Sequence, residues 1–245
     1  MSRTSRPGAP LGRAEPLRRL AVVPAGFAAY VEVGAKRAFA GAVEWPGWCR
    51  AGRDPDAALE ALIAYAPRYA AALRGTRLGF QVPSGPSDLD LAERLKGDAT
   101  TDFGAPSIAP KADARPIDEA GLRRLTSILK ACWRTFDRDV EAARGRTLAK
   151  GPRGGGRDLS KIADHVTDAE GGYARMLGWK VEPGPKGSQA DRTRSAVLDA
   201  LATTAVEGPP PPGPRGGKRW LPRYFVRRVA WHTLDHGWEI QDRAA

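Results

Sequence analysis

The chain of 245 residues contains three histidines, and two of them, His232 and His236, are four residues apart near the C-terminus. Residues at this spacing lie about 40° apart around a helix and one turn apart along it. Both imidazoles can therefore bind one metal ion if a third ligand comes from a facing helix. His165, in the segment KIADHVTDAEGGYARMLG, is the expected third ligand. The alternative is a structural histidine pair that is hydrogen-bonded inside a core.

The residues around His232 favour the metal site. At 100° per residue, ionisable side chains form a stripe between apolar margins that include Trp231 and Trp238. Buried charges need a partner or a metal, and a metal-bound imidazole usually donates its second N–H to a carboxylate. The carboxylates three residues after a histidine are the expected partners: Asp168, Asp235 and Glu239. Three further residues of the last helix are the expected substrate or thiol pocket: Tyr224, Arg228 and Trp231.

Composition limits the class of protein. The chain has no run of about twenty apolar residues, so no membrane-spanning helix is expected. Cys49 and Cys132 give no disulfide framework, and a cytoplasmic protein is the simplest interpretation. Cys132 falls on a helical core stripe, which predicts inert packing. The net charge of +11 raises the possibility of nucleic-acid binding, but the sequence contains no known nucleic-acid-binding motif.

The first half of the chain predicts a small α+β unit. Residues 1–20 are rich in Arg and Pro and predict a disordered basic tail, and residues 21–82 predict the unit itself. Within it we expect two strands in VEVGAKRAFAGAVEW, turns at PGW and AGRD, a helix from Asp56 to Leu73 and a short strand at LGFQVP. Residues 83–115 predict a linker with a short helix over Leu89–Leu95.

The second half, residues 116–245, predicts four helices. They are expected near 117–144, 158–177, 188–206 and from 222 to the C-terminus. Asp158 is a candidate N-cap, Gly178 and Gly208 follow helix ends, and Pro222 is near a first helical position. The expected fold is therefore an α+β chain of two parts, with a four-helix bundle at the C-terminal end.

A bundle with one histidine on its second helix and HxxxH on its last resembles the DinB-like (DinB/YfiT) metalloenzyme superfamily. The resemblance covers residues 116–245 and rests on His165, His232 and His236 in their helical contexts; RRVAWHTLDHGWEIQDR is also similar to the closing helix of uncharacterised actinobacterial members. It implies a metal-bound low-molecular-weight thiol, such as mycothiol, that attacks a small electrophile. The N-terminal segment FAGAVEWPGW is similar to the strand and turn of HicB-type antitoxins, which bears on fold alone.

The expected function is that of a metal-dependent thiol transferase or isomerase. Three neutral imidazoles leave an open position on Zn²⁺, Ni²⁺ or Fe²⁺, as catalytic sites require, and hydrolysis by a metal-bound hydroxide is the other chemistry of such a site. The partner is a small-molecule substrate, and a homodimer through bundle faces is a further expectation. Two alternatives stay open: a noncatalytic, metal-stabilised interaction protein, and a basic nucleic-acid-binding regulator.

Two basic loops, Arg144–Arg157 and Arg215–Arg228, precede the second and fourth helices. In a bundle that alternates up and down, both loops lie at one end. That arrangement predicts a ring of positive charge at the mouth of the metal site, which would favour an anionic substrate or thiol. A solvated basic surface is the alternative.

Overall fold

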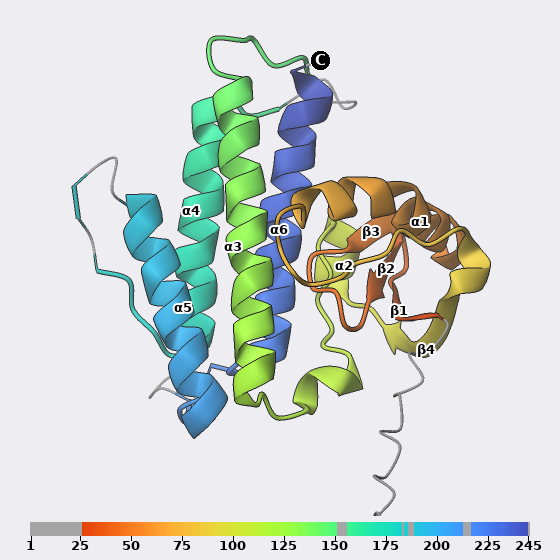
Figure 1. Ribbon diagram of the computed structural model, residues 1–245, viewed down its shortest axis with the longest axis horizontal. Coiled ribbons are helices and arrows are strands. Elements are labelled where there is room, and N and C mark those ends of the chain that lie inside the picture. Colours follow the sequence, from red (N-terminus) through yellow and green to blue (C-terminus); the bar gives the residue numbers. More distant parts are fainter. Residues whose placement is uncertain (1–25, 151–155, 183, 186–188, 213–216, 245) are drawn as a thin grey trace, which may run out of the picture.

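A computed structural model describes residues 26–150, 156–182, 184–185, 189–212 and 217–244. The expected tail at 1–20 lies outside these residues. The described chain is a mixed α/β structure that combines one four-stranded sheet with helices (Figure 1). The sheet and α1 (Pro55–Ala72) stand beside a set of four helices from the second half of the chain, and α6 (Pro222–Arg243) is the helix at the boundary between the two groups.

The sheet has the strand order β3-β2-β1-β4. Neighbouring strands pair antiparallel except β1 and β4, which are parallel. The helix α1 begins after its N-cap Asp54 and packs on the sheet, and a Cβ at Gly52 would come within 2.2 Å of the backbone of Ala58. The strands and this helix have the bounds β1 Phe27–Val33, β2 Ala38–Ala42, β3 Cys49–Gly52, α1 Pro55–Ala72 and β4 Leu89–Lys96.

The two strands around the Gly-Ala-Lys turn and the helix over Asp56–Leu73 are thus confirmed. The strand expected at LGFQVP was wrong, because this segment has no strand pairing. The four strands, α1 and their connections, residues 27–96, form what we call the sheet unit. The ring of Phe80 instead packs among aromatic rings of this unit: Phe27, Trp45, Trp48 and Tyr69. The turn expected at AGRD was partly wrong, since Ala51 and Gly52 belong to β3.

The short helix expected over Leu89–Leu95 was also wrong. This segment is the strand β4, which pairs with β1 from Phe27 opposite Leu89 to Val33 opposite Lys96. Pairing with an existing strand outweighs the local helix preference of LAERLK, as tertiary context commonly does. The range expected as a linker, 83–115, therefore contributes an edge strand, and it also holds the short helices η1 (Pro86–Asp88), α2 (Ala99–Phe103) and η2 (Lys111–Ala114).

The four helices predicted after residue 116 are present. Their bounds are α3 Glu119–Ala142, α4 Leu159–Met176, α5 Gln189–Glu207 and α6 Pro222–Arg243. Pro222 opens α6, and Gly178 and Gly208 follow α4 and α5 with φ of 85° and 77°, which suits glycine at a helix end. Asp158 has the N-cap position of α4 but makes no capping hydrogen bond; its carboxylate pairs with Lys161 at 3.1 Å.

The helix order is not simple up-and-down, so the expected ring of two basic loops was wrong. The backbone N–H of Ala149, before α4, donates to the carbonyl of Arg243 at the end of α6. The N–H of Trp220, before α6, donates to the carbonyl of Met176 at the end of α4. The described ends of the two loops, at Ala149 and Trp220, therefore lie at opposite ends of the antiparallel pair α4 and α6. Figure 1 shows that α5 runs in the same direction as α4.

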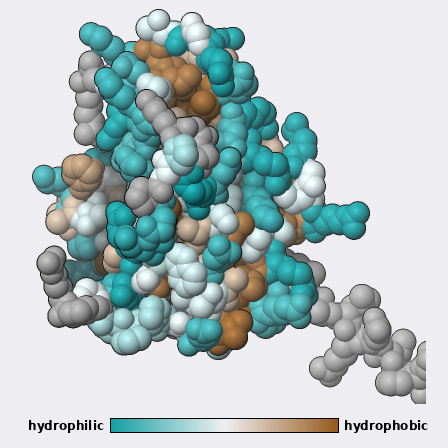
Figure 2. Space-filling view, turned by 90° about the vertical axis from the view of Figure 1, so that its left-hand side faces the viewer, coloured by the Kyte–Doolittle hydropathy of each residue, from teal (hydrophilic) through white to brown (hydrophobic). Residues whose placement is uncertain are grey.

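Apolar packing joins the sheet unit to the helices. One core cluster contains Val31 and Trp48 of the sheet unit together with Phe225 and Trp238 of α6. Trp48 is fully buried and donates its indole N–H to the carbonyl of Leu62 at 2.7 Å, so its role is structural. On the face seen in Figure 2, hydrophobic side chains form small patches between hydrophilic ones. Among the described helices, none combines the length and apolar character that crossing a membrane requires.

Candidate metal centre

The three histidines meet between α4 and α6. One nitrogen of each ring can be chosen so that all three lie within 4.8 Å of one another, and Nε2 of His165 is 3.2 Å from Nε2 of His232. The ring centroids are 5.0 Å apart for His165 and His232, 5.0 Å for His165 and His236, and 4.6 Å for His232 and His236. Two nitrogens bound tetrahedrally to Zn²⁺ at about 2.1 Å lie about 3.4 Å apart, so this triangle has the size of a metal site.

Helix geometry explains the meeting. His232 and His236 share one side of α6 because they are one turn apart. His165 is six residues after the start of α4, and His236 is seven residues before the end of α6. Since the two helices are antiparallel, those positions have about the same height at 1.5 Å per residue.

Burial favours the neutral form of two of the imidazoles, those of His165 and His232. His232 is 7% exposed, and burial lowers its pKa well below the usual value, with the neighbouring His236 and His165 acting in the same direction. Burial also lowers the pKa of His165, followed by the charge of Arg157. A neutral ring has a nitrogen lone pair to give to a metal, so a lowered pKa at His165 and His232 favours metal binding by these two residues.

Glu239 orients one of the rings. Its Oε2 is 2.7 Å from Nδ1 of His236, and its Oε1 accepts a hydrogen bond of 2.6 Å from Arg243. The bond to His236 is the main reason that the pKa of Glu239 is lowered. A carboxylate on Nδ1 fixes the proton there and leaves Nε2 as the ligand atom. The buried Nδ1 of His232 has no hydrogen-bond partner among the described residues.

The other two expected carboxylates do not bond to a histidine in the described part of the chain. Asp235 forms an ion pair of 2.6 Å with Arg50 of β3, so it ties α6 to the sheet. Asp168 is exposed on α4, where its charge acts to raise the pKa of His165 against the larger effect of burial. Of the three carboxylates expected from their spacing, Glu239 therefore bonds to an imidazole, and Asp168 and Asp235 do not in the described part of the chain.

Of the expected pocket residues, Tyr224 and Arg228 lie about two turns and one turn before His232 and contact the segment 105–108, and Trp231 directly precedes His232. The guanidinium of Arg228 is buried, donates to the carbonyl of Pro106 and lies 5.1 Å from the ring centre of Trp231. The hydroxyl of Tyr224 donates to the carbonyl of Ser107 at 2.7 Å. Trp231 packs edge-on against Phe39 of β2, with ring centroids 5.9 Å apart. These three side chains thus join α6 to the sheet unit beside the histidines.

Tyr173 of α4 is a site residue that the sequence analysis did not identify. Its ring centroid is 5.7 Å from that of His232, and its hydroxyl accepts a bond of 3.4 Å from Arg228. It follows His165 by eight residues on α4, a spacing that returns to within about 80° of the same helix face. Tyr173 therefore links the histidines to the buried guanidinium.

Glu170 is a second residue that the sequence reasoning missed. Its side chain is buried, and Oε1 accepts bonds from the indole N–H of Trp133 at 2.7 Å and the hydroxyl of Thr233 at 3.0 Å. Burial raises its pKa to about 7. The signal was an acid four residues after Val166 on the buried stripe of α4.

Neither cysteine can supply a thiolate at neutral pH. Cys132 is buried in the main core, as its place on the stripe predicted, and burial raises its pKa. Burial likewise raises the pKa of Cys49 to about 12. Both are free thiols. Thiol chemistry at this site would need a small-molecule thiol.

Comparisons with family models, with curated proteins and with solved structures find no match to this chain.

Proposed function

We propose that the chain is a divalent-metal-dependent enzyme of the DinB-like type, a thiol-dependent transferase or isomerase for a small electrophile. The supporting observation is the triangle of imidazoles that His165, His232 and His236 form between α4 and α6. Three nitrogen ligands suit Zn²⁺, Ni²⁺ or Fe²⁺ and leave a coordination position open. A metal with an open position would lower the pKa of a thiol or water bound there.

The protein groups around the triangle would bind and orient the substrate. Arg228 holds a permanent positive charge beside the site, and its buried Nε has no partner among the described residues. The rings of Tyr173, Trp220 and Trp231 surround that guanidinium at 5.5, 5.9 and 5.1 Å. In a poorly hydrated setting, a fixed cation favours an anionic group on a substrate or thiol.

Metal analysis of the purified protein tests the centre. Wild type should hold close to one divalent ion per chain, and His165→Ala and His232→Ala should each lose most of it. Asp235→Asn is the matched control, because its carboxylate pairs with Arg50 and not with a histidine. Equal metal content in wild type and both histidine variants would contradict the proposal.

An activity assay distinguishes a catalytic metal from a structural one. The metal-loaded protein should consume an electrophilic chromogen only when mycothiol or another low-molecular-weight thiol is present, and His232→Ala should abolish this. The alternative of a metal that only ties α4 to α6 predicts bound metal, no such reaction, and unfolding when the metal is removed.

A further inference from the structure

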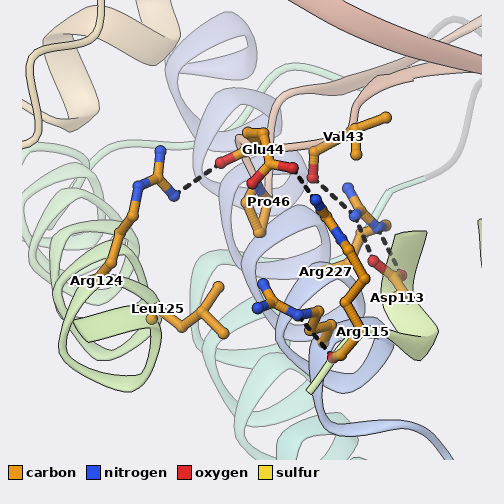
Figure 3. A pocket seen from close by; sticks show the side chains of 10 residues that line it. Val43, Glu44, Pro46, Asp113, Arg115, Arg124, Leu125 and Arg227 are labelled. Atoms are coloured by element: carbon orange, nitrogen blue, oxygen red, sulfur yellow. Dashed lines mark hydrogen bonds and ion pairs between the residues drawn. The ribbon is translucent and has the colours of Figure 1, made fainter. Parts of the chain in front are cut away.

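We propose that the cavity at the junction of the sheet unit, α3 and α6 is a binding site for a phosphate group, separate from the histidine centre. Figure 3 shows side chains that line this cavity. Its volume is about 120 Å³. It is bordered by the turn after β2, the η2 segment and the first turns of α3 and α6. Its charged lining residues are Glu44, Asp113, Arg115, Arg124, Arg223 and Arg227.

The lining has more positive than negative charge. Four arginines and two carboxylates leave an excess of two positive charges, since 4 − 2 = 2. Arg227 is matched by Asp113, and Arg115 pairs with Glu44 at the exposed edge. Arg124 and Arg223 form no ion pair with a carboxylate in the described part of the chain. Asp118 lies near this cavity, but its Oδ1 accepts the N–H of Gly121 as the cap of α3.

Main-chain carbonyls hold these two arginines in place. Arg124 donates to the carbonyl of Glu44 at 2.7 Å, and its guanidinium lies 4.3 Å from the ring centre of Trp45. Arg223 donates from Nε to the carbonyl of Arg115 at 3.0 Å and from Nη2 to that of Pro116 at 2.8 Å. Each guanidinium has further N–H groups, so both present fixed donors that are not taken up by an ion pair in the described part of the chain.

The two cations are close enough to oppose each other. Burial lowers the pKa of Arg124; the charges of Tyr69 and Glu44 act to raise it, and the charge of Arg223 acts in the same direction as burial. A dianionic phosphate would remove that repulsion and accept the planar, charge-assisted bonds that guanidinium forms best with phosphate and carboxylate. The first turns of α3 and α6 add the positive ends of two helix dipoles. The Arg115–Glu44 ion pair at the edge of the cavity is exposed and contributes little stability, so it can open to admit an anion.

The cavity and the metal centre use different faces of α6. Arg223 and Arg227 are one turn apart on one face, while Arg228, His232 and His236 follow each other at four-residue steps on another. Arg227 and His232 are five residues apart, which turns the side chain by about 140° around the helix. Phosphate at the cavity therefore would not compete with a metal held by the histidines.

Calorimetric titration of inorganic phosphate into the full chain, after chelation of metals, tests this site. We expect saturable binding of one phosphate per chain, weakened at least about tenfold in Arg124→Gln and in Arg223→Gln, because each removes one charge-assisted donor. Arg123→Gln is the matched control: it removes the same charge from the neighbouring position, where the side chain pairs with exposed Glu119. His232→Ala should bind phosphate as wild type does.

A glycerol phosphate titration shows whether a phosphate ester binds as well as the free ion. Circular dichroism of each variant verifies folding, and Arg124 and Arg223 are on different helices, so one can serve if the other fails to fold. No saturable binding to wild type would overturn the proposal. An equal loss in Arg123→Gln would also overturn it, since a general effect of net charge would then explain the affinity.

Discussion

The carboxylates beside the histidines differ in what they touch, although Asp235 and Glu239 share the same spacing. Glu239 bonds to His236 at 2.7 Å, whereas Asp235 pairs with Arg50. Partners of metal-bound imidazoles typically change metal affinity by about 10- to 100-fold. We therefore expect Glu239→Gln to weaken Zn²⁺ binding by about that factor, measured by competition with a chromophoric chelator.

Asp235→Asn is the control for this prediction, because it changes a carboxylate at the same spacing on the same helix. It should leave Zn²⁺ affinity within about twofold of wild type, because Asp235 forms a partly exposed ion pair with Arg50 and does not bond to a histidine. If both variants weakened binding equally, a general loss of negative charge and not the hydrogen bond to His236 would be the cause.

Glu170 gives stability an unusual dependence on pH. Its pKa is raised from 4.5 to about 7 by burial, so the folded state holds a proton that the unfolded state releases above about pH 4.5. The stability contributed by the neutral carboxyl is present at low pH and is lost as pH rises from about 4.5 to 7. A shift of this size corresponds to at most about 3 kcal/mol.

Glu170→Gln tests the sign of this dependence. Gln keeps an oxygen that accepts from Trp133 and Thr233 and cannot ionise. In urea unfolding of metal-free protein between pH 4.5 and 7.5, the free energy of unfolding of the variant should gain on wild type as pH rises. The histidines titrate equally in both proteins and cancel in the difference. A constant difference would show that Glu170 does not titrate in this range.

The sequence predicted the histidine triangle but not these neighbours. His232 and His236 are linked by local helix geometry, which a sequence displays directly. Asp235 and its partner Arg50 are 185 residues apart, and Glu170 is 37 and 63 residues from its partners Trp133 and Thr233, so only the fold brings them together. An acid on a buried stripe was visible at Glu170, but its hydrogen-bond donors were not.

Among the elements, the long helices were predicted within a few residues, and the errors in secondary structure fall at Ala51–Gly52 and between residues 78 and 96. A helix with three-residue and four-residue periodicity carries its own signal. A strand such as β4 depends on the distant β1 for every ladder bond, and the helix-forming residues of LAERLK gave the opposite local signal. The direction of α5 has no local signal at all, which is why the loop arrangement was wrong.

The attachment of α6 to the sheet depends on a buried ion pair. Arg227 donates two bonds to Asp113, of 2.6 and 3.0 Å, and bonds to the carbonyls of Ala42 and Val43. Removing one partner of such a pair leaves a buried charge uncompensated at a cost of about 3–5 kcal/mol. We expect Arg227→Met to lower the free energy of unfolding by about this amount in urea titrations.

Arg53→Ala provides the comparison for this element. Its pair with Asp54 is exposed, with 89% of the arginine side chain accessible, so the change should stay within about 0.5 kcal/mol. The double change Arg227→Met with Asp113→Leu should recover part of the lost stability, because it removes both buried charges. A small effect of Arg227→Met alone would mean that water replaces the guanidinium.

On the scale of the whole molecule, the sheet unit and the helices share one core. The main cluster includes Val31 and Leu62 of the sheet unit with Leu129 and Val229 of the helices. Arg227 and Asp235 add polar links across the same junction. Arg50 and Arg227, which form these links, belong to the excess of basic residues that suggested nucleic-acid binding. A shared core predicts that neither half unfolds independently.

Metal binding should then stabilise the whole chain and not α4 and α6 alone. A ligand at 100 times its Kd stabilises the folded state by about 2.7 kcal/mol. Heating should give coincident transitions for tryptophan fluorescence, which reports on the seven indoles of both halves, and for circular dichroism at 222 nm, which the helices dominate. Excess Zn²⁺ should raise both midpoints together, and His232→Ala should remove that shift. Two separate transitions, with the metal moving one of them, would show that the sheet unit folds without the metal-bound helices and that the shared core does not couple them.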